Sequence, residues 1–263
     1  MLKGSARHIA RRWVTRHPVV YLPIARSRKR NAAVDQGTDI VIDGFYRSAG
    51  TFSVIAFQLA QNNHLRVAHH LHAAAQFIAA AELGTPTLIT VRPPEPTILS
   101  AMLREPVVTP GQWLKFYAEF YERILPIRDR FVVATFDDVT SDFGAVTRRI
   151  NQRFRTNFKE FRHTEENVAT CFALIEERSE GPPWGDPLRR FLSGIISADE
   201  YWAATRPYRE ERERYWHDVP EHRIARPSQE REAFKTEVRS RYLVPRLTGL
   251  RRRAEQAYED FAG

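Results

Sequence analysis

The sequence predicts an α/β fold with three layers, in which a mainly parallel central sheet carries helices on both faces. Short apolar runs rich in β-branched residues alternate with helical patterns from residue 38 to residue 153, and this order is typical of a parallel sheet. The first run leads through a turn of small residues into a helix, which is the start of a P-loop-like nucleotide-binding core. With 263 residues, of which 43% are hydrophobic, the chain can fill one such domain and add C-terminal helices.

The strands and helices of this alternation can be placed along the chain. Strands are expected at residues 38–43, 65–70, 86–92 and 131–136. Helices are expected at residues 50–62, 72–83, 95–104, 110–124 and 142–153. The helix at 110–124 has the strongest start, because Thr109 is a preferred N-cap, Pro110 suits the first position and Gln112 completes a capping box.

Residues beyond the alternation are predicted to be mainly helical. A helix at 164–178 precedes a turn-rich break at 179–187, and a final helical pair spans about 228–262. The predicted organisation is a basic N-terminal arm at 1–36 and a single domain at 37–263, divided into a core at 37–178, a peripheral layer at 179–225 and C-terminal helices at 226–263.

The positive charge is concentrated at the N-terminus. The net charge is +8, but residues 1–30 hold nine Lys or Arg and no acid, which leaves 31 basic and 32 acidic residues elsewhere. This distribution speaks against a nucleic-acid-binding domain. It is typical of a solvated arm, and it also allows an arm that touches anionic lipid or an organellar transit peptide. No apolar run approaches the ~20 residues that span a bilayer, and there is no secretory signal pattern. A cytoplasmic location is expected, with peripheral membrane contact as an option.

The chain has one cysteine, Cys171, which lies among Val168, Phe172 and Leu174 in a helical pattern. A single cysteine cannot form an intramolecular disulfide. The apolar neighbours favour a buried core thiol over a nucleophile, because reactive cysteines prefer electropositive and partly exposed surroundings.

The segment from residue 39 to residue 53 carries the clearest chemical signal. Its apolar run meets Gly44 and then a loop with one cation, Arg47, and the hydroxyls of Ser48, Thr51 and Ser53, before a helical pattern begins. A strand, a small-residue loop and a helix N-terminus together direct backbone N–H groups at an anion. The segment therefore predicts a site for a phosphate or sulfuryl group, although an ordinary strand–turn–helix corner would have a similar pattern.

The loop departs from the Walker A pattern, Gly-x-x-x-x-Gly-Lys-Ser/Thr. Counted from Gly44, Ala49 takes the second Gly position, Gly50 takes the Lys position and Thr51 is in register. The only cation of the loop is Arg47. A P-loop kinase that uses Mg-ATP is therefore the alternative and not the first choice.

A second segment adds to this site. Residues 87–91 read as a buried strand that ends at Arg92, and the following helix carries Ser100. In a parallel sheet, ligands bind outside the carboxyl ends of the strands, so Arg92 and Ser100 are expected at the same edge as the loop. Asp137 and Asp138, which follow the last strand, could mimic a magnesium-binding Walker B acid, but a turn at the start of a helix is the favoured interpretation.

These residues resemble the sulfotransferase family, whose donor is 3′-phosphoadenosine 5′-phosphosulfate. The family loop, roughly Pro-Lys-Ser-Gly-Thr-Thr-Trp, is similar to residues 46–52, Tyr-Arg-Ser-Ala-Gly-Thr-Phe, without a gap. The family's second motif has an Arg at the end of a strand, a nearby Pro and a Ser eight residues after the Arg, and Arg92, Pro94 and Ser100 match it. The resemblance covers about residues 38–155 and becomes vague from about residue 176.

The histidine-rich end of the second expected strand also fits this family. Residues 67–72, Val-Ala-His-His-Leu-His, resemble the family strand that ends in Thr-His-Leu-Pro, and this similarity places the catalytic base at His70. His72 is close enough to substitute, because alternate residues of a strand point to the same side. Residues 131–139 resemble the family strand that ends in Tyr-Glu-Asp-Leu.

The resemblance implies transfer of a sulfuryl group to a hydroxyl or amine by in-line displacement, without a metal cofactor. It implies the catalytic residues Arg47, His70 and His72, and the donor-binding residues Arg47, Ser48, Ala49, Gly50, Thr51, Phe52, Arg92 and Ser100. The loop N–H groups and Thr51 would hold the 5′-phosphate, and Arg92 and Ser100 would hold the 3′-phosphate. The acceptor is a small molecule or carbohydrate whose identity the sequence does not specify, and the peripheral layer is expected to cover it.

Several features depart from this family or compete with it. The family's Lys is Arg47 here, one Thr is Gly50, and its C-terminal Arg-Lys-Gly loop has no clear counterpart. Arg231 and Lys235 are interpreted as an exposed helix face, with contact to the 3′-phosphate as the alternative. The histidines could bind zinc, but no nearby motif supplies a third ligand. The chain could also be a non-catalytic protein that binds anionic surfaces through residues 1–30.

Overall fold

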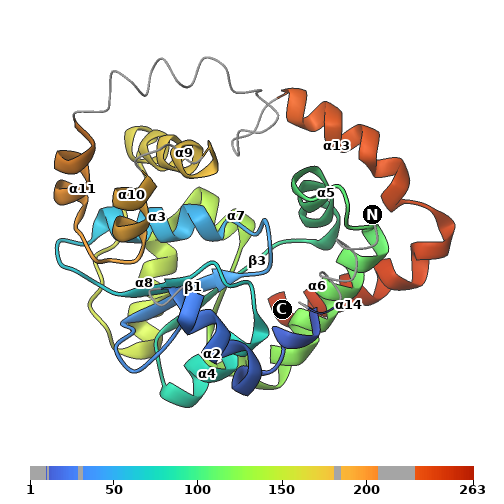
Figure 1. The fold of residues 1–263 in the computed structure, drawn as a ribbon, viewed down its shortest axis with the longest axis horizontal. Coiled ribbons are helices and arrows are strands. Elements are labelled where there is room, and N and C mark those ends of the chain that lie inside the picture. Colours follow the sequence, from blue (N-terminus) through green and yellow to red (C-terminus); the bar gives the residue numbers. More distant parts are fainter. Residues whose placement is uncertain (1–9, 11, 29–31, 181–184, 207–228) are drawn as a thin grey trace.

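The computed structural model describes residues 10, 12–28, 32–180, 185–206 and 229–263 of the chain. Figure 1 shows a central sheet with helices packed on both of its faces, so the predicted three-layer α/β fold is confirmed. Two hydrophobic cores, one on each side of the sheet, hold these layers together.

The four strands found in the described residues form one sheet in which every strand is parallel to its neighbours. They are β1 (Ile40–Gly44), β2 (Val67–His69), β3 (Thr87–Val91) and β4 (Val132–Thr135). Their order is β2-β1-β3-β4, so the strand order reverses between β1 and β3. Gly44 pairs with Thr90, and Val91 pairs with Thr135, which brings the carboxyl ends of β1, β3 and β4 to one edge.

One face of the sheet is covered by α4 (Ala74–Leu83), α5 (Pro94–Arg104), α6 (Pro110–Ile124) and α14 (Thr248–Ala262). Val41 and Ile89 of the sheet join this core. Phe45, directly after β1, lies among a group of aromatic rings supplied mainly by α6. The loop that follows β1 is therefore anchored at its start by a large buried side chain.

The opposite face is covered by α3 (Gly50–Ala60), α7 (Phe136–Ser141), α8 (Phe143–Phe154), α9 (Glu165–Glu180), α10 (Gly185–Leu192) and α11 (Ala198–Thr205). Ile40 and Ile42 of β1 face this second core, because successive side chains of a strand alternate between its two sides. Cys171 is fully buried here, and burial raises the pKa of its thiol to about 12, so the prediction of a core cysteine is confirmed.

The remaining described elements include η2 (Leu125–Arg130), η5 (Pro245–Leu247) and α13 (Gln229–Tyr242). α13 and α14 form the predicted C-terminal helical pair, and α13 packs on α5. An ion pair of 2.7 Å between Arg239 and Glu95 joins α13 to α5. Figure 1 shows α13 on the outer side of α5.

The two helix starts after β3 and β4 show how local sequence sets the fold. The predicted capping box of α6 is confirmed. The backbone N–H of Gln112 donates to Thr109 Oγ1 at 3.3 Å, and the backbone N–H of Thr109 donates to Gln112 Oε1 at 2.9 Å. α7 is not among the predicted helices, and it begins with a second capping box formed by Thr135 and Asp138. The favoured interpretation of the acidic pair, a turn at the start of a helix, is confirmed.

The second strand is shorter than predicted. β2 ends at His69, and the backbone of His70 and His72 is left-handed, with φ angles of 56° and 50°. The expectation that these two side chains project from one side of a strand is therefore wrong. The chain turns here because the next backbone N–H groups bond to the side chain of Asp43 and not to a neighbouring strand.

Part of the predicted N-terminal arm is packed on the domain. α2 (Pro18–Arg28) contacts α4, and Leu22 and Ala25 are buried in this contact. Trp13 and Val19 are exposed, and the start of the arm lies outside the described residues. No helix in the described part of the chain has the length and hydrophobicity that crossing a membrane requires.

The predicted peripheral layer is described only in part. α10 and α11 pack on each other, and α10 also packs on α3 and α9. The turn-rich break predicted at 179–187 falls between α9 and α10, with residues 181–184 outside the described residues. Residues 207–225 of this layer lie outside them as well.

Candidate functional site

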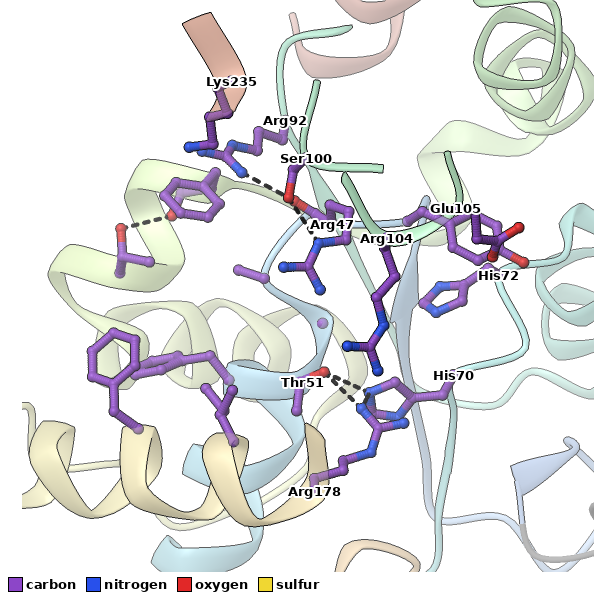
Figure 2. Close-up of a pocket in the computed structure, with 18 of the residues that line it drawn as sticks. Arg47, Thr51, His70, His72, Arg92, Ser100, Arg104, Glu105, Arg178 and Lys235 are labelled. Carbon is purple, nitrogen blue, oxygen red and sulfur yellow. Dashed lines mark hydrogen bonds between the residues drawn. The ribbon is translucent and has the colours of Figure 1, made fainter. Parts of the chain in front are cut away.

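A pocket of about 640 Å³ opens at the carboxyl ends of the strands. Its walls come from the loop after β1 with the start of α3, the loop after β2, the segment from β3 into α5, and side chains of α7, α9 and α13. Figure 2 shows side chains from these elements pointing into a common space. The pocket lies where the strand order reverses, which is the place at which open α/β sheets bind ligands.

All of the predicted site residues except Ser48 line this pocket. The Ser48 hydroxyl donates to Phe45 O at 2.6 Å and lies 2.9 Å from Thr90 Oγ1. The Ser48 side chain is buried and fixes the loop to the sheet. It is therefore not presented to a ligand in the pocket.

The loop after β1 has an unusual backbone for its sequence. Arg47 and Ala49 both have positive φ angles, 64° and 71°, although neither is glycine. Gly44 is required at the end of β1, because a Cβ atom there would lie 2.3 Å from Thr90 O. Left-handed residues at alternate positions gather successive N–H groups into a concave anion site, and α3 begins at that point.

Arg47, Arg92 and Ser100 meet on one wall of the pocket, as predicted. Arg47 Nε donates to Ser100 Oγ at 2.9 Å, and Arg92 Nη1 donates to Arg47 O at 3.3 Å. The guanidinium carbon of Arg92 lies 3.9 Å from the centre of the Phe136 ring. This cation–π contact helps to orient the guanidinium group of Arg92. Groups from two distant segments are thus brought together on one wall of the pocket (Figure 2).

Lys235 of α13 also lines the pocket, which corrects the prediction of an exposed helix face. Its side chain is 16% exposed and forms an ion pair with Glu232, one turn earlier on the same helix. The side chain of Arg231, the other basic candidate, lies outside the described residues. No local pattern distinguishes Lys235, because its place in the pocket depends on the packing of α13 against α5.

One buried carboxylate, Asp43, organises the histidine loop after β2, and no sequence pattern singles it out. It accepts hydrogen bonds from the N–H groups of Gly44 at 2.9 Å, Leu71 at 2.8 Å and His72 at 3.1 Å. Gln76 Nε2 donates to it at 3.3 Å. These bonds join the ends of β1 and β2 and impose the left-handed turn.

His72 is the side-chain partner of Asp43. Its Nδ1 lies 3.1 Å from Asp43 Oδ1 and 2.9 Å from Gly44 O, and because a carbonyl oxygen only accepts, Nδ1 is assigned the proton. Burial by itself would raise the pKa of Asp43, but electrostatic attraction to His72 and hydrogen bonds from His72 and Gly44 outweigh it and hold the pKa below its usual range. Among the described residues, His72 Nε2 has no hydrogen-bond partner, and the ring faces the pocket (Figure 2).

His70 is engaged by its neighbours in a different way. Its Nε2 lies 2.9 Å from Thr51 Oγ1 and 2.7 Å from Arg178 Nη1, and Arg178 also donates to Thr51 Oγ1 at 2.8 Å. A guanidinium can only donate, so His70 Nε2 is an acceptor in this arrangement. Its Nδ1 contacts His69 Nδ1. Both ring nitrogens of His70 are therefore occupied, whereas His72 keeps one nitrogen open to the pocket.

Arg104 and Arg178 are pocket residues that the sequence pattern does not reveal. Arg104 ends α5, and Arg178 comes from α9 on the other side of the pocket (Figure 2). Part of the Arg178 side chain is exposed, but its guanidinium lies within the pocket. Desolvation there, with repulsion from Arg104 acting against attraction to Asp43, lowers the pKa of Arg178 to about 10. The group stays charged at neutral pH.

The side of the pocket next to α9 is apolar. Phe52, Phe172 and Ile175 lie there, and the ring centres of Phe52 and Phe172 are 5.9 Å apart. Flat aromatic rings pack well on such a surface, with edge or face contacts to the two phenylalanines. A ligand with an aromatic base and anionic groups would therefore match both halves of the pocket.

The pocket as a whole is strongly cationic. Five Lys or Arg side chains line it, against two carboxylates, Glu105 and Glu232. Asp137 and Asp138 do not line it, and no group of three or more His, Cys, Asp or Glu residues placed to hold a metal occurs in the described ranges. This excess of cations suits a ligand with more than one anionic group.

Comparisons of the chain with protein-family models, with curated proteins and with solved structures find no match. Apart from Ser48, the predicted site residues that carry the resemblance to the sulfotransferase family lie together in the pocket.

Proposed function

We propose that this protein is a sulfotransferase, which moves a sulfuryl group from 3′-phosphoadenosine 5′-phosphosulfate to a hydroxyl or amine acceptor. The observation that carries the proposal is the junction of Arg47, Arg92 and Ser100. These contacts join residues that are 53 and 45 positions apart in the sequence. The two motifs that resemble the family are thereby combined in one site at the sheet edge.

The donor has two anionic ends that match two parts of the pocket. The 5′-phosphosulfate would lie on the loop N–H groups at the start of α3, with Arg47 as the adjacent cation. The 3′-phosphate would lie among Arg92, Ser100 and Lys235, where bidentate pairing with a guanidinium recognises phosphate. The adenine would pack on the apolar side at Phe172.

The alternative, a P-loop kinase, has less support. A kinase of this type needs an acid that holds magnesium near the transferred phosphate, and the acidic pair at 137–138 starts α7 without lining the pocket. The loop also has Gly50 at the position of the Lys that contacts the β- and γ-phosphates. The cations around Arg92 would have no partner on ATP, which lacks a 3′-phosphate.

His72 is better placed than His70 to accept the proton of the acceptor. Asp43 holds Nδ1 of His72, which leaves Nε2 as an acceptor that faces the pocket. His70 Nε2 is already bonded to Thr51 and Arg178. The family resemblance places the base at His70, whereas we propose His72 as the base. In this proposal His70 orients Thr51 and Arg178.

In the proposed reaction, the acceptor oxygen or nitrogen attacks sulfur from the side opposite the leaving phosphate. The new bond to sulfur forms as the bond between sulfur and the bridging oxygen breaks, and adenosine 3′,5′-bisphosphate leaves with that electron pair. The acceptor proton passes to His72 Nε2. Arg47 and the loop N–H groups neutralise the charge that develops on the leaving oxygen, which is the main contribution of a rigid, preorganised site.

Stabilisation by ligands tests this proposal against the kinase alternative. A ligand at 100 times its Kd stabilises the fold by about 2.7 kcal/mol, which raises the melting temperature by roughly 5–10 °C for a chain of this size. Adenosine 3′,5′-bisphosphate should have this effect, and Mg-ATP at the same concentration should have a much smaller one. A larger shift with Mg-ATP would favour the kinase.

A second role, contact with an anionic membrane surface, is favoured by the N-terminal helix. Trp13, Val19 and Ile24 are 56%, 88% and 41% exposed, and Arg26 and Arg28 lie on the same helix as the latter two. Exposed apolar side chains beside basic ones are typical of helices that lie in a membrane interface. Vesicles that contain phosphatidylserine should co-sediment the protein, and Val19→Asp should reduce co-sedimentation without changing nucleotide binding. Unchanged co-sedimentation would remove α2 from this role.

A further inference from the structure

Two arginines of the pocket, Arg104 and Arg178, have no carboxylate partner among the described residues. Arg104 forms no ion pair within these ranges, and Arg178 donates to the uncharged acceptors Thr51 Oγ1 and His70 Nε2. Lys235 differs, because its charge is paired on its own helix. We refer to Arg104 and Arg178 as the arginine pair.

The two guanidinium groups of the arginine pair face the same space. Figure 2 shows Arg104 extending from α5 and Arg178 extending from α9 towards each other, with His70 beside them. Their charges repel, and this repulsion is one reason why the pKa of Arg178 is lowered. Two like charges that converge repel each other, and an anion that binds both would relieve the repulsion.

The arginine pair is separate from the proposed 3′-phosphate wall, and it borders the proposed phosphosulfate site, because Arg178 donates to Thr51 Oγ1 at 2.8 Å. The proposed 3′-phosphate wall is formed around Arg92, whereas the pair lies on the histidine side of the pocket (Figure 2). An acceptor whose proton passes to His72 has to lie on this side as well. The arginine pair therefore lies beside the proposed sulfuryl group, on the side from which the acceptor would approach His72.

We propose that the arginine pair binds a phosphate, carboxylate or sulfate group of the acceptor, so that the substrates are acidic alcohols or amines. This inference rests on the proposed sulfuryl transfer. Glu105 adds a direction, because it lies near His72 on the far side from Arg178 (Figure 2). An acidic acceptor is repelled by Glu105 and drawn to the arginine pair, so its anionic end binds there and its hydroxyl is presented to His72.

Inorganic phosphate probes this anion site independently of catalysis. With adenosine 3′,5′-bisphosphate at saturation, phosphate should still raise the melting temperature relative to sodium chloride at the same ionic strength. Arg104→Ala and Arg178→Ala should each weaken the apparent affinity for phosphate about tenfold or more, because each removes a charged hydrogen bond. Arg252→Ala removes an exposed arginine of α14 outside the pocket, and this control should respond like the wild type.

Two outcomes of the phosphate titration would overturn the site. In the first, phosphate raises the melting temperature of both pocket variants as much as that of the wild type. In the second, phosphate raises the melting temperature of the wild type no more than sodium chloride does. Arg178→Lys keeps the charge and should retain a phosphate response stronger than that of Arg178→Ala. This comparison separates loss of the anion contact from a general loss of folding.

Matched acceptors test the substrate class. Sulfuryl transfer is compared for 4-hydroxyphenylacetate against 4-methylphenol and for glucose 6-phosphate against glucose, since the members of each pair differ in the anionic group. The acidic member should have a kcat/KM about tenfold higher or more, and Arg104→Ala should remove this preference. Equal or better use of the neutral members, or no transfer to either acidic compound, would overturn the inference.

The failure of this inference can be distinguished from failure of the proposed function. If adenosine 3′,5′-bisphosphate does not bind the wild type, sulfuryl transfer is wrong, and phosphate titration of the free protein still reports on the arginine pair. If the bisphosphate binds and Arg104→Ala leaves the phosphate response unchanged, only the role of the arginine pair is wrong.

Discussion

Replacement of Asp43 by Asn tests the framework that holds the histidine loop. The carboxylate is 1% exposed and accepts hydrogen bonds from Gly44, Leu71, His72 and Gln76. Asparagine has the same shape, but it offers one acceptor oxygen and one NH2 group that can only donate. The substitution therefore keeps the packing and removes the acceptor capacity and the charge.

The expected loss of stability follows from the contacts of one oxygen. Oδ1 of Asp43 faces Gly44 N–H at 2.9 Å and His72 Nδ1 at 3.1 Å, so an NH2 group in its place would face two donors. Each lost charged hydrogen bond contributes roughly 1.5–3 kcal/mol, and a neutral amide is easier to desolvate than a carboxylate. The free energy of unfolding should fall by about 3–5 kcal/mol, as for other broken buried ion pairs.

The same substitution should change the pH dependence of stability. The pKa of Asp43 is lower in the folded protein than its ordinary value of 3.8, so the ionised group stabilises the fold above that pH. This contribution is lost as the pH falls through the folded pKa. Asp43→Asn has no such group, so its stability should depend less steeply on pH in this acid range.

Urea unfolding at about pH 7 and about pH 3 measures both effects. Asp129→Asn, the same change at an exposed position of η2, is the control and should alter the free energy of unfolding by less than about 1 kcal/mol. A loss below about 1 kcal/mol for Asp43→Asn, or an acid profile equal to that of the wild type, would refute the reasoning about this carboxylate.

Three further predictions concern the pocket. Arg92→Ala and Ser100→Ala should each weaken binding of adenosine 3′,5′-bisphosphate by roughly 1.5–3 kcal/mol in calorimetric titration. Binding of adenosine 5′-phosphosulfate should hardly change, and equal losses for both ligands would contradict the 3′-phosphate assignment. Arg47→Lys should keep the sulfuryl transfer that Arg47→Ala abolishes, and an inactive Lys variant that still binds nucleotide would show that the loop is wrongly aligned. In single-turnover kinetics, His72→Ala should slow the chemical step roughly 10²–10⁴-fold and remove its rise with pH, with a smaller effect of His70→Ala; the reverse ranking would return the base to His70.

The sheet could be predicted because its signals are local. All four strands begin and end within two residues of the predicted bounds, since apolar runs and turn residues mark them directly. The left-handed turn directly after β2 was not predicted, because it depends on hydrogen bonds to Asp43, a residue of another strand. The packing of α2 on α4 was missed for a similar reason, because a basic, acid-free segment has the composition of a solvated arm.

The donor side of the candidate site could be predicted because its residues are close in sequence or follow adjacent strands. Arg47, Arg92 and Ser100 all lie at positions that parallel-strand geometry brings to one edge. Arg178 and Lys235 could not be predicted in the same way, because they come from helices far along the chain. A single basic residue on a mixed helix looks like an ordinary solvated position until the packing of that helix is known.

Isothermal titration of the wild-type protein with adenosine 3′,5′-bisphosphate and with adenosine 5′-monophosphate tests the central claim most directly. We predict that the 3′-phosphate increases the affinity roughly 10–150-fold, the equivalent of one charged contact with the wall formed by Arg92, Ser100 and Lys235. Arg92→Ala should remove most of this increase. Equal affinities for the two nucleotides would contradict the assignment of the pocket to a 3′-phosphorylated sulfuryl donor.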